Sequence, residues 1–184
     1  MSRFLLSAGL ASALLVAPTV VSTQAGKSPV QVLVIDTAKG IIEVELNTAD
    51  APKAVAHIVD LANRGFYRGQ RFHWVRPGVI QFGDPLSRDL TKAKEWGSGG
   101  SGPRNTNQPM KVAELSKKPF IRGVVGLAYR SDMSPETADS QMFILTAPNP
   151  AMVGKYVQIG KVTKGMNVAD KVEMQDVIKN VSVR

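Results

Sequence analysis

Short apolar segments separated by turn-forming residues constrain the fold of this chain more than any other feature. Most are rich in β-branched residues or alternate apolar and polar side chains, a pattern typical of strands with one buried face. They cover residues 30–35, 41–47, 71–76, 79–83, 122–129, 140–147, 155–163 and 176–184. Residues 52–65 and 165–174 are predicted as helices. We therefore predict a mainly β fold, a closed eight-stranded antiparallel β-barrel capped by two α-helices.

The ends of the first helix are marked by residues with special backbone properties. Pro52 is suited to a helix start, because its missing N–H would have no partner there. Gly65 is suited to the position just past the helix end, where a left-handed conformation is common. Val55, Ile58 and Val59 fall at helical spacing between them.

The first 25 residues are predicted to be a secretory signal peptide. Arg3 provides a positive start, residues 4–16 are apolar and uncharged, and Ala25 ends a small-residue cleavage site. The apolar run is shorter than the roughly 20 residues of a spanning helix, and Pro18 interrupts the segment; an uncleaved membrane anchor is the alternative. We expect cleavage after Ala25, a mature domain of residues 26–184, a secreted or periplasmic location and no stable membrane association after cleavage.

Composition limits the other functional classes. The 184 residues are 43% hydrophobic and 21% charged, which suits one globular domain with a core. Cysteine is absent, so disulfides and thiol chemistry are excluded. The net charge is +8, but the basic residues are scattered and lack interleaved aromatic residues. We therefore expect no nucleic-acid partner.

Two features that can indicate cofactor sites are interpreted as structural. The stretch "WGSGGSG" at residues 96–102 lacks the Lys-Ser/Thr that completes a phosphate-binding loop, so we predict a flexible loop. His57 and His73 are the only histidines, and neither belongs to a carboxylate constellation suited to a metal. We predict no metal and no cofactor.

Three segments carry a family resemblance. They are "RFHWVRPGVIQFGDP" with the strand and helix before it, "GVVGLAY" followed by "ADSQMFILTA", and "VGKYVQIGKVTKGMNVADKVE". Together they resemble the cyclophilin-type peptidyl-prolyl isomerases, in the same order and at compatible spacing. The resemblance extends from residue 30 to about residue 174.

The resemblance implies a shallow apolar pocket for a substrate proline, flanked by polar groups. Gln81 matches the site glutamine of the family, and Phe143 matches the pocket floor, although core packing alone would also explain Phe143. His73 precedes the family arginine position and is equally consistent with a buried structural histidine. The implied substrate-binding residues are His73, Val79, Ala128, Tyr129, Gln141, Phe143, Met152 and Tyr156.

The sequence departs from the family at the position expected to carry the chemistry. Trp74 stands where the family has an arginine. The chain also has one residue fewer than the family between Phe72 and Gln81, so the pocket phenylalanine of the family is either absent or replaced by Val79. Arg76 lies two residues beyond Trp74 and, in a strand, on the same face. It can supply a guanidinium to the pocket or be a solvated strand-end charge. Trp74 can cover the proline ring or fill vacated space.

We therefore interpret the chain as an exported peptidyl-prolyl cis-trans isomerase with reduced or altered activity. Arg76, Gln81 and Trp74 are the predicted catalytic residues, and proline-containing polypeptides are the predicted partners of a monomeric enzyme. The alternative is a non-catalytic module on the same fold that binds proline-containing segments as a chaperone.

Overall fold

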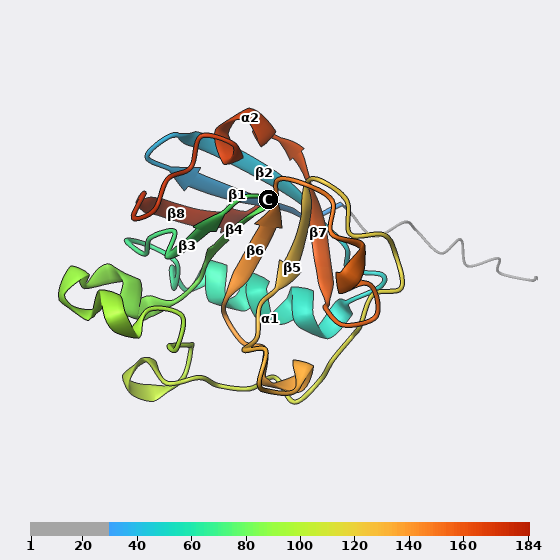
Figure 1. The fold of residues 1–184 in the computed structure, drawn as a ribbon, viewed down its shortest axis with the longest axis horizontal. Helices are drawn as coiled ribbons and strands as arrows, with labels where there is room; N and C mark the ends of the chain where they lie inside the picture. The colour runs from blue at the N-terminus through green and yellow to red at the C-terminus, as the bar shows by residue number, and fades with distance from the viewer. Residues whose placement is uncertain (1–29) are drawn as a thin grey trace, which may run out of the picture.

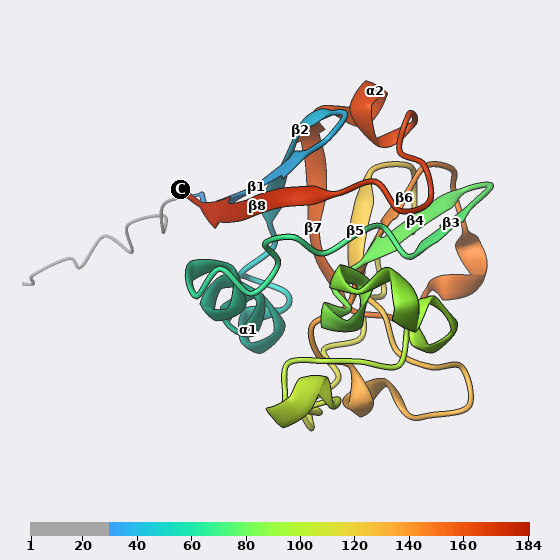
Figure 2. The same cartoon turned by 90° about the vertical axis from the view of Figure 1, so that its left-hand side faces the viewer.

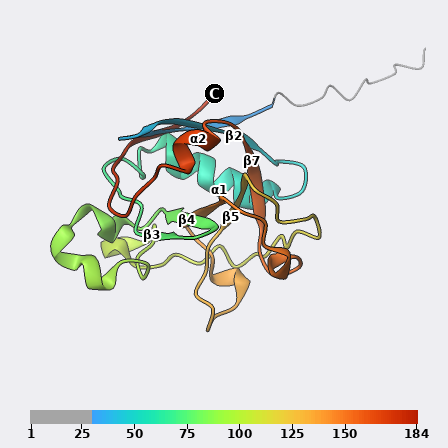
Figure 3. The same cartoon turned by 45° about the horizontal axis from the view of Figure 1, so that its top comes forward.

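The computed structural model describes residues 30–184, so the predicted signal peptide lies outside the described residues. Within them, one antiparallel sheet has the strand order β3-β4-β6-β5-β7-β2-β1-β8. The sheet curls, so that β1 and β2 lie across the molecule from β3 and β4 (Figure 3). The strands are β1 Val32–Thr37, β2 Gly40–Leu46, β3 Trp74–Arg76, β4 Val79–Phe82, β5 Val124–Leu127, β6 Met142–Leu145, β7 Gln158–Lys164 and β8 Ile178–Val183.

The eight predicted strands form, but the prediction of a closed barrel is wrong. The ladder ends at β3 on one side and at β8 on the other. Between these edges, residues 69–72 meet residues 175–178 through one isolated bridge, Arg71 with Val177, and a few backbone hydrogen bonds. Phe72 still donates its N–H to Asp176 O beside β8, whereas the N–H of His73 already donates to β4. The backbone pairing thus changes from the segment before β8 to β4 between Phe72 and His73, and no continuous ladder closes the sheet.

Helix α1, Pro52–Asn63, packs one apolar face against the sheet and contacts β8. Val55, Ile58 and Leu61 are among its fully buried side chains. Gly65 follows the helix with a φ of 69°, so both predicted ends are confirmed. Helices α1 and α2 lie towards opposite ends of the curled sheet (Figures 1 and 2).

The second helix is shorter than predicted. α2 spans only Met166–Ala169, not residues 165–174. The N–H of Glu173 donates to the carboxylate of Asp176 at 2.7 Å. This turn gives the backbone an alternative to further helical hydrogen bonds, and it directs the chain into β8.

Residues 83–123 connect β4 to β5 and contain the 3₁₀ helices η1 Pro85–Arg88, η2 Leu90–Glu95 and η3 Pro103–Asn105. The segment gathers below β3 and β4 (Figure 2). The predicted flexible loop at residues 96–102 is instead fixed by hydrogen bonds. The fully buried carboxylate of Asp84 accepts from the N–H groups of Leu86, Gly97 and Gly99.

A second buried carboxylate holds the far part of this loop. Asp139 accepts from the N–H groups of Ser101 at 2.6 Å and Gln108 at 2.8 Å, and His57 contacts it at 2.9 Å. A side chain at Gly100 would collide with Asp139. The glycines of this loop therefore allow its backbone to approach the two carboxylates closely.

Among the described residues, no helix has the length and apolar character that a membrane crossing requires.

We expect Asp139 to contribute stability that is lost in acid. Burial raises the pKa of Asp139, but hydrogen bonds from His57, Ser101 and Gln108 outweigh burial and hold the pKa below its ordinary value. A carboxyl with a lowered folded-state pKa stabilises the protein above its unfolded pKa of about 3.9, and the contribution disappears as pH falls through the folded value. Asp139→Asn should lower the free energy of unfolding at neutral pH by about 1–3 kcal/mol and by less in acid.

Urea unfolding of both proteins across this pH range checks the expectation. Asp132→Asn is the matched control, because Asp132 pairs with Arg130 at the exposed surface, where such a pair contributes about 0–1 kcal/mol. An Asp139→Asn protein as stable as the wild type at neutral pH would contradict the assignment.

Candidate active site

The site lies on the outer face of the sheet, because side chains along β4 and β6 alternate between two faces. Ile80 of β4 and Ile144 of β6 point inward to the main core. Val79 and Phe143 point to the other face, where they join a small separate apolar cluster. Gln81 pairs with Phe143 in the register of these strands and with Trp74 on β3, so the three share this face.

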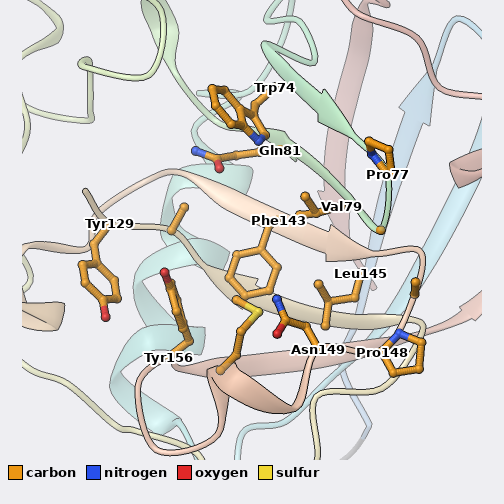
Figure 4. A pocket seen from close by; sticks show the side chains of 14 residues that line it. Trp74, Pro77, Val79, Gln81, Tyr129, Phe143, Leu145, Pro148, Asn149 and Tyr156 are labelled. Atoms are coloured by element: carbon orange, nitrogen blue, oxygen red, sulfur yellow. The ribbon is translucent and has the colours of Figure 1, made fainter. Parts of the chain in front are cut away.

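A hollow of about 460 Å³ opens on this face, and we call it the cup. Phe143 lies at its centre, with Trp74 and Gln81 along one side and Tyr129 and Tyr156 along another (Figure 4). The cup is lined by Trp74, Pro77, Gly78, Val79, Gln81, Ala128, Tyr129, Phe143, Leu145, Ala147, Pro148, Asn149, Met152 and Tyr156.

The phenylalanine floor is held by its neighbours. Its ring meets the ring of Tyr156 edge to face, with centroids 5.6 Å apart. Gly126 pairs with Phe143 across β5 and β6, and a Cβ at Gly126 would collide with the phenylalanine ring. The Phe143 ring therefore occupies the space that a side chain at position 126 would fill.

Within residues 30–184, no charged side chain lines the cup. Arg76 lies outside the lining and places its guanidinium 4.6 Å from the centre of the Trp74 ring, where it also donates to Val75 O. Trp74 and Arg76 therefore share one face of β3, as predicted, and the guanidinium packs against the indole. Trp74 is 47% exposed, and its Nε1–H has no hydrogen-bond partner among residues 30–184.

The polar side of the cup is backed by a glutamine pair and a histidine. Gln81 Nε2 donates to Gln141 Oε1 at 2.9 Å, and His73 Nε2 contacts the same oxygen at 3.1 Å. Because Gln141 Oε1 can only accept, this contact is a hydrogen bond when the proton of the neutral His73 ring lies on Nε2. His73 Nε2 also lies 3.4 Å from Gln81 Nε2. Burial lowers the pKa of His73, with Asp84 and Gln141 opposing it, so the ring is neutral at pH 7.

His73 and Gln141 therefore lie behind the cup and are absent from its lining. They contribute to an adjoining hollow of about 890 Å³ that reaches the loop at Gly97 and Gly99. Ala128, together with Trp74, Gln81 and Tyr129, lines both hollows. The cup is also lined by the other predicted substrate-binding residues, which are Val79, Tyr129, Phe143, Met152 and Tyr156.

Some residues of the cup were missed by the sequence analysis. Leu145 follows Phe143 by two positions, so strand alternation was a signal that places it on the same face. Pro148 and Asn149 lie in the loop after β6, which is tied down where the Asn149 N–H donates to Phe120 O at 2.8 Å. Nothing in the local sequence indicates that contact.

Across residues 30–184, no group of three or more histidine, cysteine or acidic side chains is arranged to hold a metal ion.

Comparisons with known proteins agree with this architecture. Residues 32–183 match the family model of the cyclophilin type peptidyl-prolyl cis-trans isomerases. A probable peptidyl-prolyl cis-trans isomerase of Brucella suis is 37% identical over 181 residues, covering 95% of this chain and 89% of its own length. A peptidyl-prolyl cis-trans isomerase of Helicobacter pylori is 35% identical over 150 residues, covering 80% of this chain and 83% of its own length.

Solved structures give the same result. The crystal structure of a cyclophilin type peptidyl-prolyl cis-trans isomerase from Cryptosporidium parvum, determined in the presence of the dipeptide Ala-Pro, has a TM-score of 0.70 and 25% identity. The match covers 83% of this chain and 98% of that one. This chain therefore belongs to the cyclophilin-type peptidyl-prolyl cis-trans isomerases.

Proposed function

We propose that this isomerase rotates X–Pro bonds of exported polypeptides in an uncharged cup, more slowly than a site with a guanidinium would. The observation that carries the proposal is the cup itself, an apolar hollow with polar groups along one side and no charged lining residue. A proline ring suits such a hollow, and the Cryptosporidium relative, solved with Ala-Pro present, supports a proline-containing ligand.

The reaction requires a site that binds the twisted amide better than the planar one. Rotation faces a barrier of roughly 18–20 kcal/mol from amide resonance, and a donor aimed at the twisted bond lowers it. Trp74 Nε1–H is a donor beside the cup that has no partner among residues 30–184, and Gln81 is the polar side chain next to it. We assign the donor contact with the reacting amide to Trp74, and the contact with the adjoining substrate backbone to Gln81.

Arg76 acts through Trp74 in this proposal. A guanidinium over an exposed indole contributes about 0.5–1 kcal/mol, enough to bias the rotamer of Trp74. The reduced rate follows from the missing charged donor, because removing one preorganised donor typically costs about 10²–10³ in rate.

The cellular setting remains a prediction. The composition of residues 1–25 supports export with cleavage after Ala25 and a periplasmic or secreted location. The mature domain, residues 26–184, then assists the folding of exported proteins as a monomer.

Exchange NMR on an X–Pro peptide tests the catalytic assignment. We expect wild type to accelerate exchange, Trp74→Arg to raise kcat/KM by about tenfold or more, and Arg76→Ala to lower it by about two- to fivefold, the rate equivalent of the cation–π contact. Lys179→Ala, a change on β8 remote from the cup, is the control. Binding without acceleration by wild type would instead support the non-catalytic binding module.

Replacing the cup floor tests whether Phe143 supports the substrate. Phe143→Leu should lower kcat/KM by about tenfold or more, the rate equivalent of ~1.4 kcal/mol, because the substrate loses an aromatic surface. Phe120→Leu is a matched control, since Phe120 is equally buried in the same cluster but absent from the cup lining. Equal losses in the two variants would mean that packing, and not substrate contact, explains Phe143.

The export proposal predicts a mature N-terminus at Gly26. Expression of the full chain in a Gram-negative host, followed by fractionation and intact-mass measurement, should recover that form from the periplasm. A full-length chain in the cytoplasmic or membrane fraction would exclude the signal-peptide assignment.

A further inference from the structure

Gln141 uses every polar atom of its side chain within the protein. Its Nε2 donates to the carbonyl oxygens of Gly97 at 2.9 Å and Gly99 at 2.8 Å. Its Oε1 accepts from Gln81 Nε2 at 2.9 Å and from His73 Nε2 at 3.1 Å. An amide has two N–H donors and two lone pairs to offer, so no group of Gln141 is free to bind a substrate.

These contacts leave only one orientation for both glutamine amides. Carbonyl oxygens only accept, so Gln141 must turn Nε2 to the loop and Oε1 to Gln81. Gln81 must then turn its own Nε2 to Gln141. The Oε1 of Gln81 remains without a hydrogen bond among the described residues, yet it is not a buried atom.

The loop that imposes this orientation is itself fixed from behind. Asp84 Oδ2 accepts from the N–H of Gly97 at 2.5 Å and of Gly99 at 3.2 Å. A side chain at Gly99 would collide with Asp84. The same two glycines thus bind Asp84 through their N–H groups and Gln141 through their carbonyl groups.

We infer that Gln141, held by the Gly97 and Gly99 carbonyls, is a positioning residue that presents Gln81 Oε1 to the substrate as an acceptor. The inference rests on the proposed role of Gln81 in the cup. Proline has no N–H, so the donor that pairs with Gln81 Oε1 is a backbone N–H of a residue flanking the proline. Through Gln81, the enzyme therefore recognises the peptide backbone beside the proline.

Gln141→Glu tests the positioning role. Ionised, the new carboxylate faces two carbonyl oxygens and cannot donate; protonated, it restores one hydrogen bond. Burial beside carbonyl groups raises the pKa of a carboxyl. We expect kcat/KM to fall about tenfold to hundredfold near neutral pH and to recover in part at about pH 5, with little change in peptide affinity.

Gln158→Glu is the matched control. Gln158 is 7% exposed, and its Nε2 likewise donates to two carbonyl oxygens, those of Lys118 and Pro119, both at 3.1 Å. It is absent from both hollows at the site. The same chemical change there should disturb packing to a similar degree while leaving kcat/KM within about twofold, a difference of under ~0.5 kcal/mol.

A second measurement reports on Gln81 without relying on activity. In a ¹⁵N-labelled protein, the Gln81 side-chain amide should exchange slowly in wild type and Gln158→Glu, and rapidly in Gln141→Glu near neutral pH. Gln141→Glu behaving like Gln158→Glu in both rate and amide exchange would overturn the positioning role. Slow amide exchange in a wild type that fails to accelerate isomerisation would keep the positioning role and overturn the proposed function instead.

N-methylated peptides test whether Gln81 Oε1 accepts a hydrogen bond from the substrate. N-methylation of the residue before or after proline removes one flanking N–H at a time. With the wild type, we expect kcat/KM to fall about tenfold for one of the two methylated peptides, the rate equivalent of ~1.4 kcal/mol. With Gln81→Leu, which lacks the acceptor, methylation should lower kcat/KM little further. Full activity on both methylated peptides would refute an acceptor role for Gln81.

Discussion

Side chains along β4 and β6 alternate between two faces of the sheet, and this alternation builds both the core and the cup. One set of alternate residues, such as Ile80 and Ile144, fills the interior of the curled sheet. The other set, such as Val79 and Phe143, builds a second, smaller cluster on the outside. A shift of one residue in register would exchange these sets. The core and the cup therefore depend on the same strand pairing.

Close backbone approaches join the site to the rest of the domain. Gly126 leaves room for the Phe143 ring, and Gly99 lets the loop reach Asp84. A buried carboxylate that accepts several N–H groups fixes a loop more firmly than packing of exposed side chains does. The Gly-rich loop consequently serves as a rigid support for the glutamine pair.

Neutral groups set the electrostatic character of the cup. Its lining among residues 30–184 has no charged side chain, and the guanidinium of Arg76 lies over the indole ring of Trp74. Shape and neutral hydrogen-bonding groups are therefore left to discriminate between the planar and twisted forms of the bond. Such groups are worth less than charged ones, which accounts for the lower rate that we propose.

The antiparallel β class, the position and both ends of α1, the family and most of the cup could be predicted from the amino-acid sequence, because alternation, turn residues and ordered motifs are local signals. Long-range contacts keep the sheet open between β3 and β8, place Arg76 outside the cup and fix the loop. Tertiary contacts also turn Gln141 Nε2 to the carbonyl groups of the loop. These outcomes depend on contacts between residues far apart in the chain, such as Gly97 with Gln141, and no local pattern encodes which distant carbonyl or carboxylate a side chain meets.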